Sequence, residues 1–119
     1  APTDPARPGN MRSIAVTLSV ALEKVASPDE TLNAQLLIDG EPMTMELEKG
    51  RAAVKCGTTP LAEVTLETDY APFLEASEGR LPLKQYLDEH ARVTTKRPEK
   101  AALLAELFHR IVTRQRAGA

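Results

Sequence analysis

The sequence predicts an α+β domain in which helices pack on one face of a five-stranded, mostly antiparallel sheet. A chain of 119 residues has the size of one ordinary domain. Over four short segments between residues 32 and 67, apolar side chains alternate with polar ones, as in antiparallel strands with one covered face. Beyond residue 69 the apolar spacing changes to i, i+3 and i+4, which is typical of amphipathic helices. A run of strands followed by helices favours the α+β class.

The first folded segment, residues 11–25, fits two patterns. One set of apolar side chains alternates as in a strand: Ile14, Val16, Leu18, Val20 and Leu22. Another set fits a helical stripe: Met11, Ile14, Leu18, Ala21, Leu22 and Val25. The segment is longer than a typical strand of about 5 or 6 residues, and its last residues favour helix. We therefore predict a helix that ends at Ser27-Pro28-Asp29.

The next segments are predicted to form a four-stranded meander. A strand over residues 32–38 leads into Asp39-Gly40, a strong hairpin signal because both residues tolerate positive φ. The second strand has an apolar face formed by Met43, Met45 and Leu47.

Lys49-Gly50 forms the turn into the third strand, residues 51–56, and the fourth strand covers residues 63–67. In the third strand Ala52, Val54 and Cys56 share one face. Cys56 is therefore expected to be a small core residue.

Two short helices follow. Asp69 is the predicted N-cap of a helix that starts at Tyr70 and stops at Gly79. The second helix carries Leu83, Tyr86 and Leu87 on one face.

A fifth strand is predicted over residues 91–95, with Val93 pointing inward, and Pro98 suits the first turn of the final helix. The apolar side of that helix consists of Ala101, Leu104, Leu107, Phe108 and Ile111. Three arginines gather toward its end, where cations suit the helix dipole: Arg110, Arg114 and Arg116.

Composition sets the boundaries of the domain and excludes several classes of protein. Residues 1–10 contain three prolines and are predicted to be a linker or disordered, so the predicted domain covers residues 11–116. No apolar run approaches the ~18 residues of a membrane span. A single cysteine, with no group of Cys and His at zinc-ligand spacing, predicts a reducing, cytoplasmic setting.

No motif predicts catalysis. Nucleophile-elbow and phosphate-binding glycine motifs are missing from the sequence, and no serine stands beside a histidine. His90 and His109 have no ligand spacing, and Glu46 and Glu48 share a strand face that is expected to be solvated. We therefore expect no enzyme, no cofactor and no metal site.

The charge distribution is uneven. Residues 1–79 carry 6 basic and 13 acidic side chains, a net −7, whereas residues 80–119 carry 9 and 4, a net +5. Solvated helix faces explain this asymmetry. The overall charge of −2 and the absence of Trp argue against recognition of nucleic acid.

Three stretches carry a family resemblance: Gly50–Val54, residues 62–68, and residues 69–81 with their Gly79-Arg80-Leu81 step. With the order of elements, they resemble the sterol carrier protein type 2-like family over roughly residues 30–113. The resemblance implies a five-stranded sheet with helices over one face and an apolar tunnel between the two layers. Members of this family bind or carry lipids, and the domain is also fused to bacterial winged-helix regulators, acetyltransferases and alkyl sulfatases.

With this resemblance, the apolar helix faces become candidate walls of a cavity. The expected ligand-binding residues are Met43, Met45, Val54, Phe73, Leu74, Tyr86, Leu87, Leu104, Phe108 and Ile111. Tyr70 and Tyr86 are candidate polar handles, because a buried hydroxyl needs a partner. An ordinary filled core remains the alternative for each residue.

Three functions remain open. The preferred one is a non-enzymatic module that binds a hydrophobic small molecule or lipid, as the effector-sensing part of a larger transcriptional regulator. The second is a ligand-free structural or dimerisation domain, in a homodimer or fused to a partner domain. The third is a basic surface for nucleic acid or anionic lipid at Arg110, Arg114 and Arg116; the preferred interpretation expects no direct contact with nucleic acid.

Overall fold

The computed structural model describes the backbone of residues 11–117 and the side chains of residues 14–114. The predicted linker, residues 1–10, lies outside the described residues. The order of helices and strands agrees with the sequence-based prediction. The elements are α1 (Met11–Val25), β1 (Leu32–Ile38), β2 (Glu41–Glu48), β3 (Arg51–Cys56), β4 (Val64–Thr68), α2 (Tyr70–Ser77), α3 (Leu83–Glu89), β5 (Ala91–Thr95) and α4 (Pro98–Ala117).

The five strands form one sheet in the order β3-β2-β1-β4-β5. Three of the pairings are antiparallel, and β1 pairs with β4 in parallel. The predicted α+β class with a five-stranded sheet is confirmed, with the refinement that the sheet is mixed. The predicted meander is wrong at its last strand, because β4 lies beside β1 instead of β3.

The crossover from β3 to β4 explains this difference. Gln35, on the sheet face opposite the helices, accepts a hydrogen bond from the Thr59 backbone N–H at 2.9 Å and donates to the Gly57 carbonyl at 3.2 Å. Thr44 Oγ1 donates to the same carbonyl at 2.9 Å. These side chains hold the β3–β4 loop across β2 and β1. Local periodicity contains no signal for such long-range bonds.

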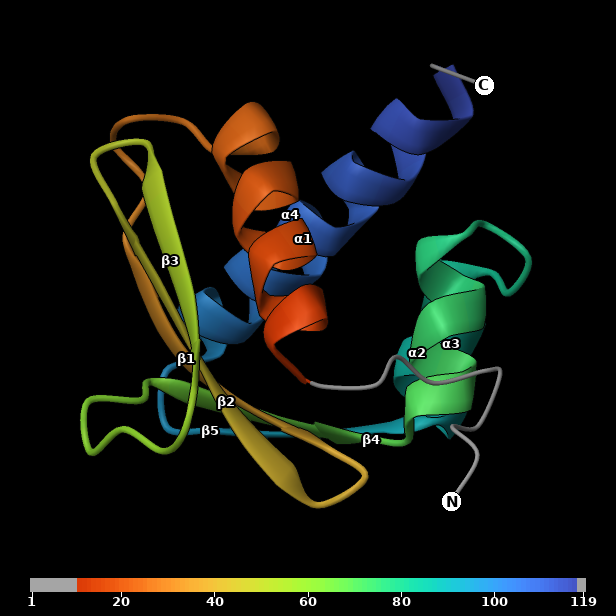
Figure 1. Ribbon diagram of the computed structural model, residues 1–119, viewed down its shortest axis with the longest axis horizontal. Coiled ribbons are helices and arrows are strands. Elements are labelled where there is room, and N and C mark those ends of the chain that lie inside the picture. Colours follow the sequence, from red (N-terminus) through yellow and green to blue (C-terminus); the bar gives the residue numbers. More distant parts are fainter. Residues whose placement is uncertain (1–10, 118–119) are drawn as a thin grey trace.

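The helices cover the other face of the sheet (Figure 1). Helix α1 packs on β3, α4 contacts α1, β5 and β1, and α3 contacts β5. Helices α2 and α3 lie together at one end of this layer, whereas α1 and α4 lie at the other. The core therefore forms between the helices and the inward faces of β1, β2 and β4.

Two inward positions on edge strands were predicted incorrectly. Cys56, the last residue of β3, is exposed. Val93 of β5 is 41% exposed, although its register partner Leu66 is fully buried. Both residues have a neighbouring strand on one side only, so alternation gave the right face but the wrong degree of burial.

Helix α2 has the predicted ends but a different N-terminal contact. Asp69 has the extended backbone of an N-cap, yet its side chain makes no capping hydrogen bond. Instead, Asp39 Oδ1 in the β1–β2 turn accepts from the Tyr70 backbone N–H at 2.9 Å. Beyond the helix, Gly79 has a φ of 79°, as expected for a glycine that ends a helix.

A candidate apolar pocket between the helices

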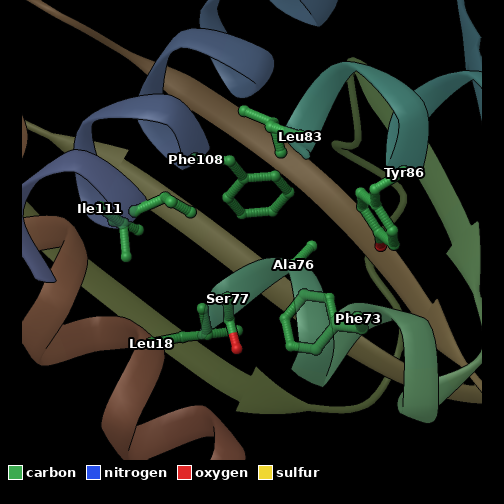
Figure 2. A pocket seen from close by; sticks show the side chains of 9 residues that line it. Leu18, Phe73, Ala76, Ser77, Leu83, Tyr86, Phe108 and Ile111 are labelled. Atoms are coloured by element: carbon green, nitrogen blue, oxygen red, sulfur yellow. The ribbon is translucent and has the colours of Figure 1, made fainter. Parts of the chain in front are cut away.

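An apolar pocket lies among the four helices, with a cavity of about 30 Å³. Figure 2 shows residues from all four helices facing one another around it. The lining residues are Leu18, Phe73, Ala76, Ser77, Leu83, Tyr86, Phe108, Ile111 and Val112. A space of this size holds little more than a water molecule, and its apolar walls offer a water no set of partners.

Helical periodicity places these residues together. Phe73, Ala76 and Ser77 have i, i+3, i+4 spacing on α2, and Phe108, Ile111 and Val112 repeat it on α4. Leu83 and Tyr86 are three residues apart on α3. Each helix therefore directs one stripe of side chains toward the pocket.

Three aromatic rings form one side of the pocket. Phe73 meets Tyr86 edge-to-face, with ring centroids 6.5 Å apart and planes at 63°. It meets Phe108 in the same manner, at 6.3 Å and 78°. Such pairs contribute roughly 0.5–1.5 kcal/mol each beyond area burial. Phe73 thus connects α2 to both α3 and α4 (Figure 2).

Tyr86 carries a buried polar atom next to this apolar space. Its side chain is 1% exposed, and its hydroxyl has no hydrogen-bond partner among the described residues. Burial raises the pKa of Tyr86 to about 12, and the hydroxyl of nearby Thr68 opposes this shift only in part. The Thr68 hydroxyl is itself engaged with the carbonyls of Asp69 and His90 at 3.2 Å each. Tyr86 is therefore a neutral donor at physiological pH.

The other candidate polar handle, Tyr70, is half-buried and does not line the pocket. Burial raises its pKa, and the charge of Glu78 adds to the effect. Ser77 does line the pocket, but its hydroxyl donates to the Leu74 carbonyl at 2.8 Å. The pocket consequently presents an almost entirely apolar surface.

Four of the ten predicted ligand-binding residues line this pocket: Phe73, Tyr86, Phe108 and Ile111. Three others lie in the core: Met43, Met45 and Leu104. The remaining three are partly buried: Val54 and Leu87 pack against the core, and Leu74 lies outside the pocket.

The predicted ligand-binding residues differ from the residues that line the pocket because no residue of the sheet lines it. The methionines of β2 have no exposed surface and belong to the same buried core as side chains of the helices. The cavity described here lies between the helices, whereas the tunnel was expected between the sheet and the helices.

Sequence reasoning missed five lining residues: Leu18, Ala76, Ser77, Leu83 and Val112. Leu18 and Leu83 carried a usable signal, since each stood on a predicted apolar helix face, and Ser77 lies four residues after Phe73 in the same predicted helix. Ala76 and Val112 stood outside the predicted apolar stripes, so their place at the pocket depends on how the helices cross.

Arg110 makes an ion pair and does not form a free basic surface. Its Nη1 and Nη2 donate to the two carboxylate oxygens of Glu30 at 2.7 and 2.9 Å, and Nη1 also donates to the Val25 carbonyl at 3.2 Å. This hydrogen bonding lowers the pKa of Glu30, although burial opposes it. The pair joins the end of α1 to α4. The predicted basic surface thus loses one of its three members, and the side chain of Arg116 lies outside the described residues.

In the part of the chain that the structure describes, no group of three or more His, Cys, Asp or Glu side chains could hold a metal ion. Among the described helices, none combines the length and apolar character that a membrane span requires. Glu46 interacts with Lys55 at 3.4 Å on the face opposite the helices.

Known proteins resemble this chain in structure. No protein-family model matches the sequence, and no curated protein matches it. A solved structure from Thermus thermophilus, described as possibly a sterol carrier protein, has a TM-score of 0.62 at 20% identity, covering 98% of this chain and 93% of that one. Palmitated sterol carrier protein 2-like 2 from Aedes aegypti has a TM-score of 0.66 at 23% identity, with 82% and 93% coverage.

A third similar structure is a much longer protein. The sec-alkylsulfatase from a Pseudomonas species has a TM-score of 0.67 at 16% identity, with 82% of this chain covering 15% of that one. The domain described here thus spans about a seventh of the sulfatase. These likenesses establish that the chain has the fold of sterol carrier protein 2-like domains.

Proposed function

We propose that this domain binds a hydrophobic small molecule or a lipid chain between its helices and catalyses no reaction. The observation that carries the proposal is the apolar pocket, in which side chains from all four helices converge on a space that no sheet residue fills. The palmitated mosquito protein of the same fold supports an acyl chain as the class of ligand.

A cavity of about 30 Å³ is far smaller than the several hundred Å³ of typical ligand sites, so binding requires the helices to separate. Helices α2 and α3 are joined to the rest of the helical layer by side-chain packing, whereas α4 is also bound to the end of α1 through Arg110, and backbone hydrogen bonds join the strands. The required movement therefore breaks apolar contacts that the ligand's own apolar surface replaces.

The test is uptake of a fluorescent fatty acid by the purified protein, together with native mass spectrometry for a retained ligand. Leu83→Arg places a charge in the pocket wall, and Gln85→Arg is the control at an exposed position of the same helix, outside the pocket. We expect Leu83→Arg to weaken binding at least tenfold, about 1.4 kcal/mol, and Gln85→Arg to leave it unchanged. Absence of a retained ligand and of uptake by the unmodified protein would contradict the proposal.

The small cavity also favours a second candidate, a ligand-free structural or dimerisation domain. The same experiment separates the two, because this candidate predicts no uptake. Sedimentation of the purified domain over a concentration series then shows whether it forms a dimer.

We also propose that the domain acts as the effector-sensing part of a larger cytoplasmic regulator. The occurrence of this fold as a small part of the Pseudomonas sulfatase chain supports its use as a module within longer proteins. A winged-helix domain encoded in the same reading frame would agree with a transcriptional regulator, and a different fused domain would contradict that role.

A further inference from the structure

Phe73 links the other two aromatic rings that line the pocket. Phe73 is 8% exposed, and its ring makes edge-to-face contacts with both Tyr86 and Phe108. In Figure 2 the ring lies beside the cavity, close to Ala76 of the same helix. Removing this ring would join its volume to the existing cavity.

The helix that carries Phe73 is a short wall of the pocket. Helix α2 has eight residues and packs on α3 and α4. Its buried residues are Phe73 and Ala76 alone, so Phe73 supplies most of the apolar volume that α2 places in the helical layer. Phe108, by comparison, belongs to a 20-residue helix that also carries the buried Leu104 and Leu107.

We propose that Phe73 is the residue that determines ligand size: its ring sets how long or how wide an apolar ligand the pocket admits. The inference rests on the proposed function and adds the feature that selects among ligands. An apolar cavity of about 150 Å³, made by truncating one large side chain, stays dry and binds benzene in another protein. Truncating Phe73 would remove a large side chain next to a cavity that already exists.

The experiment measures the affinity of a homologous series of straight-chain fatty acids, and of benzene, for four forms of the protein. These are the unmodified chain, Phe73→Ala, Phe73→Leu and the control Leu74→Ala, which changes the neighbouring side chain outside the pocket. We expect Phe73→Ala to move the best-bound fatty acid to a longer chain and to strengthen benzene binding about tenfold. Phe73→Leu, which preserves the fold if the alanine variant unfolds, should give a smaller shift in the same direction.

The outcomes separate this inference from the proposed function. An unchanged chain-length preference in both Phe73 variants, with binding retained, overturns the role of Phe73 and leaves the proposed function standing. The same shift in Leu74→Ala also overturns it, because the effect would then come from a looser α2. Binding by the Phe73 variants but not by the unmodified protein supports Phe73 as the residue that fills the site, and rejects ligand binding by the natural chain. No binding by any form overturns both.

Discussion

The inward face of the central strands and the pocket between the helices are both apolar, but they are built in different ways. On β1 and β2, Leu36, Met43 and Met45 have no exposed surface, and the ladder of backbone hydrogen bonds fixes their register. Around the pocket, Phe73, Phe108 and Ile111 are 6–8% exposed and surround an unfilled space. The comparison teaches that the sheet supplies stability, whereas the helical layer contains the adaptable part of the core.

The largest expected effect tests the sheet side of this comparison. Leu36→Ala removes a fully buried side chain between Met43 and Leu66 and should lower the free energy of unfolding by about 2–5 kcal/mol. Leu83→Ala, at a partly buried pocket position, should cost only about 1–2 kcal/mol. Urea denaturation measures both. Equal losses would remove the distinction between the two regions.

The second prediction concerns the buried hydroxyl beside the pocket. Because burial raises the pKa of Tyr86 from 10.0 to about 12, ionisation of this phenol leaves stability unaffected below pH 10. As the pH rises from 10 through 12, the unfolded state ionises more readily than the folded state, and the free energy of unfolding falls. The loss should reach about 3 kcal/mol. Thermal unfolding between pH 9 and 12, compared with Tyr86→Phe, isolates this effect, since the variant lacks it.

At neutral pH, Tyr86→Phe should be neutral or slightly stabilising, because it removes a buried hydroxyl that has no partner among the described residues. A parallel alkaline loss in both proteins would show that Tyr86 is not its cause. A clear destabilisation of the variant at pH 7 would show that the hydroxyl is hydrogen-bonded in solution.

A smaller effect is expected where α1 is held to α4. The pKa of Glu30 is lowered by Arg110, so this ion pair stabilises the protein above the ordinary pKa of glutamate and is lost as the pH falls through the lowered value. Glu30→Gln should lower thermal stability at pH 7 and flatten the acid part of the stability profile. The control is Glu46→Gln, which breaks the exposed pair with Lys55 and should change little. Similar behaviour of the two variants would contradict a specific role for the Glu30 pair.

The smallest effect concerns the edge of the sheet. Cys56→Ser should change the free energy of unfolding by less than about 0.5 kcal/mol, because the side chain is exposed. The folded protein should also react with a thiol reagent at the rate of an accessible cysteine. Protection of Cys56 until unfolding would instead place it in the core.

Local signals were sufficient for the order of helices and strands. The Asp39-Gly40 hairpin and the Gly79 stop depend on the conformational freedom of those residues, which the sequence displays directly. The pairing of β4 with β1 could not be predicted, because it depends on Gln35 and Thr44 holding a loop more than ten residues away.

The site was predicted only in part, because local spacing identifies apolar helix faces but not the long-range contacts between helices. Helical spacing identified Phe73, Tyr86, Phe108 and Ile111, since each stands on an apolar stripe. Helical spacing could not distinguish these four residues from Leu104, which stands on the same kind of apolar stripe but is buried in the core and does not line the pocket. Which stripe residues surround a space depends on the angles at which the helices cross, and no single helix encodes those angles.

The hydrogen bond between Asp39 and Tyr70 fixes one end of α2 and so determines how this helix can move. The carboxylate in the β1–β2 turn accepts the first backbone N–H of α2, so the beginning of that helix is tethered to the hairpin at the centre of the sheet. A bound ligand that displaces α2 would therefore rotate the helix about its N-terminal end at Tyr70, which this hydrogen bond holds in place. The widest excursion falls at Gly79, which makes the turn between α2 and α3 the natural place to attach a reporter of occupancy.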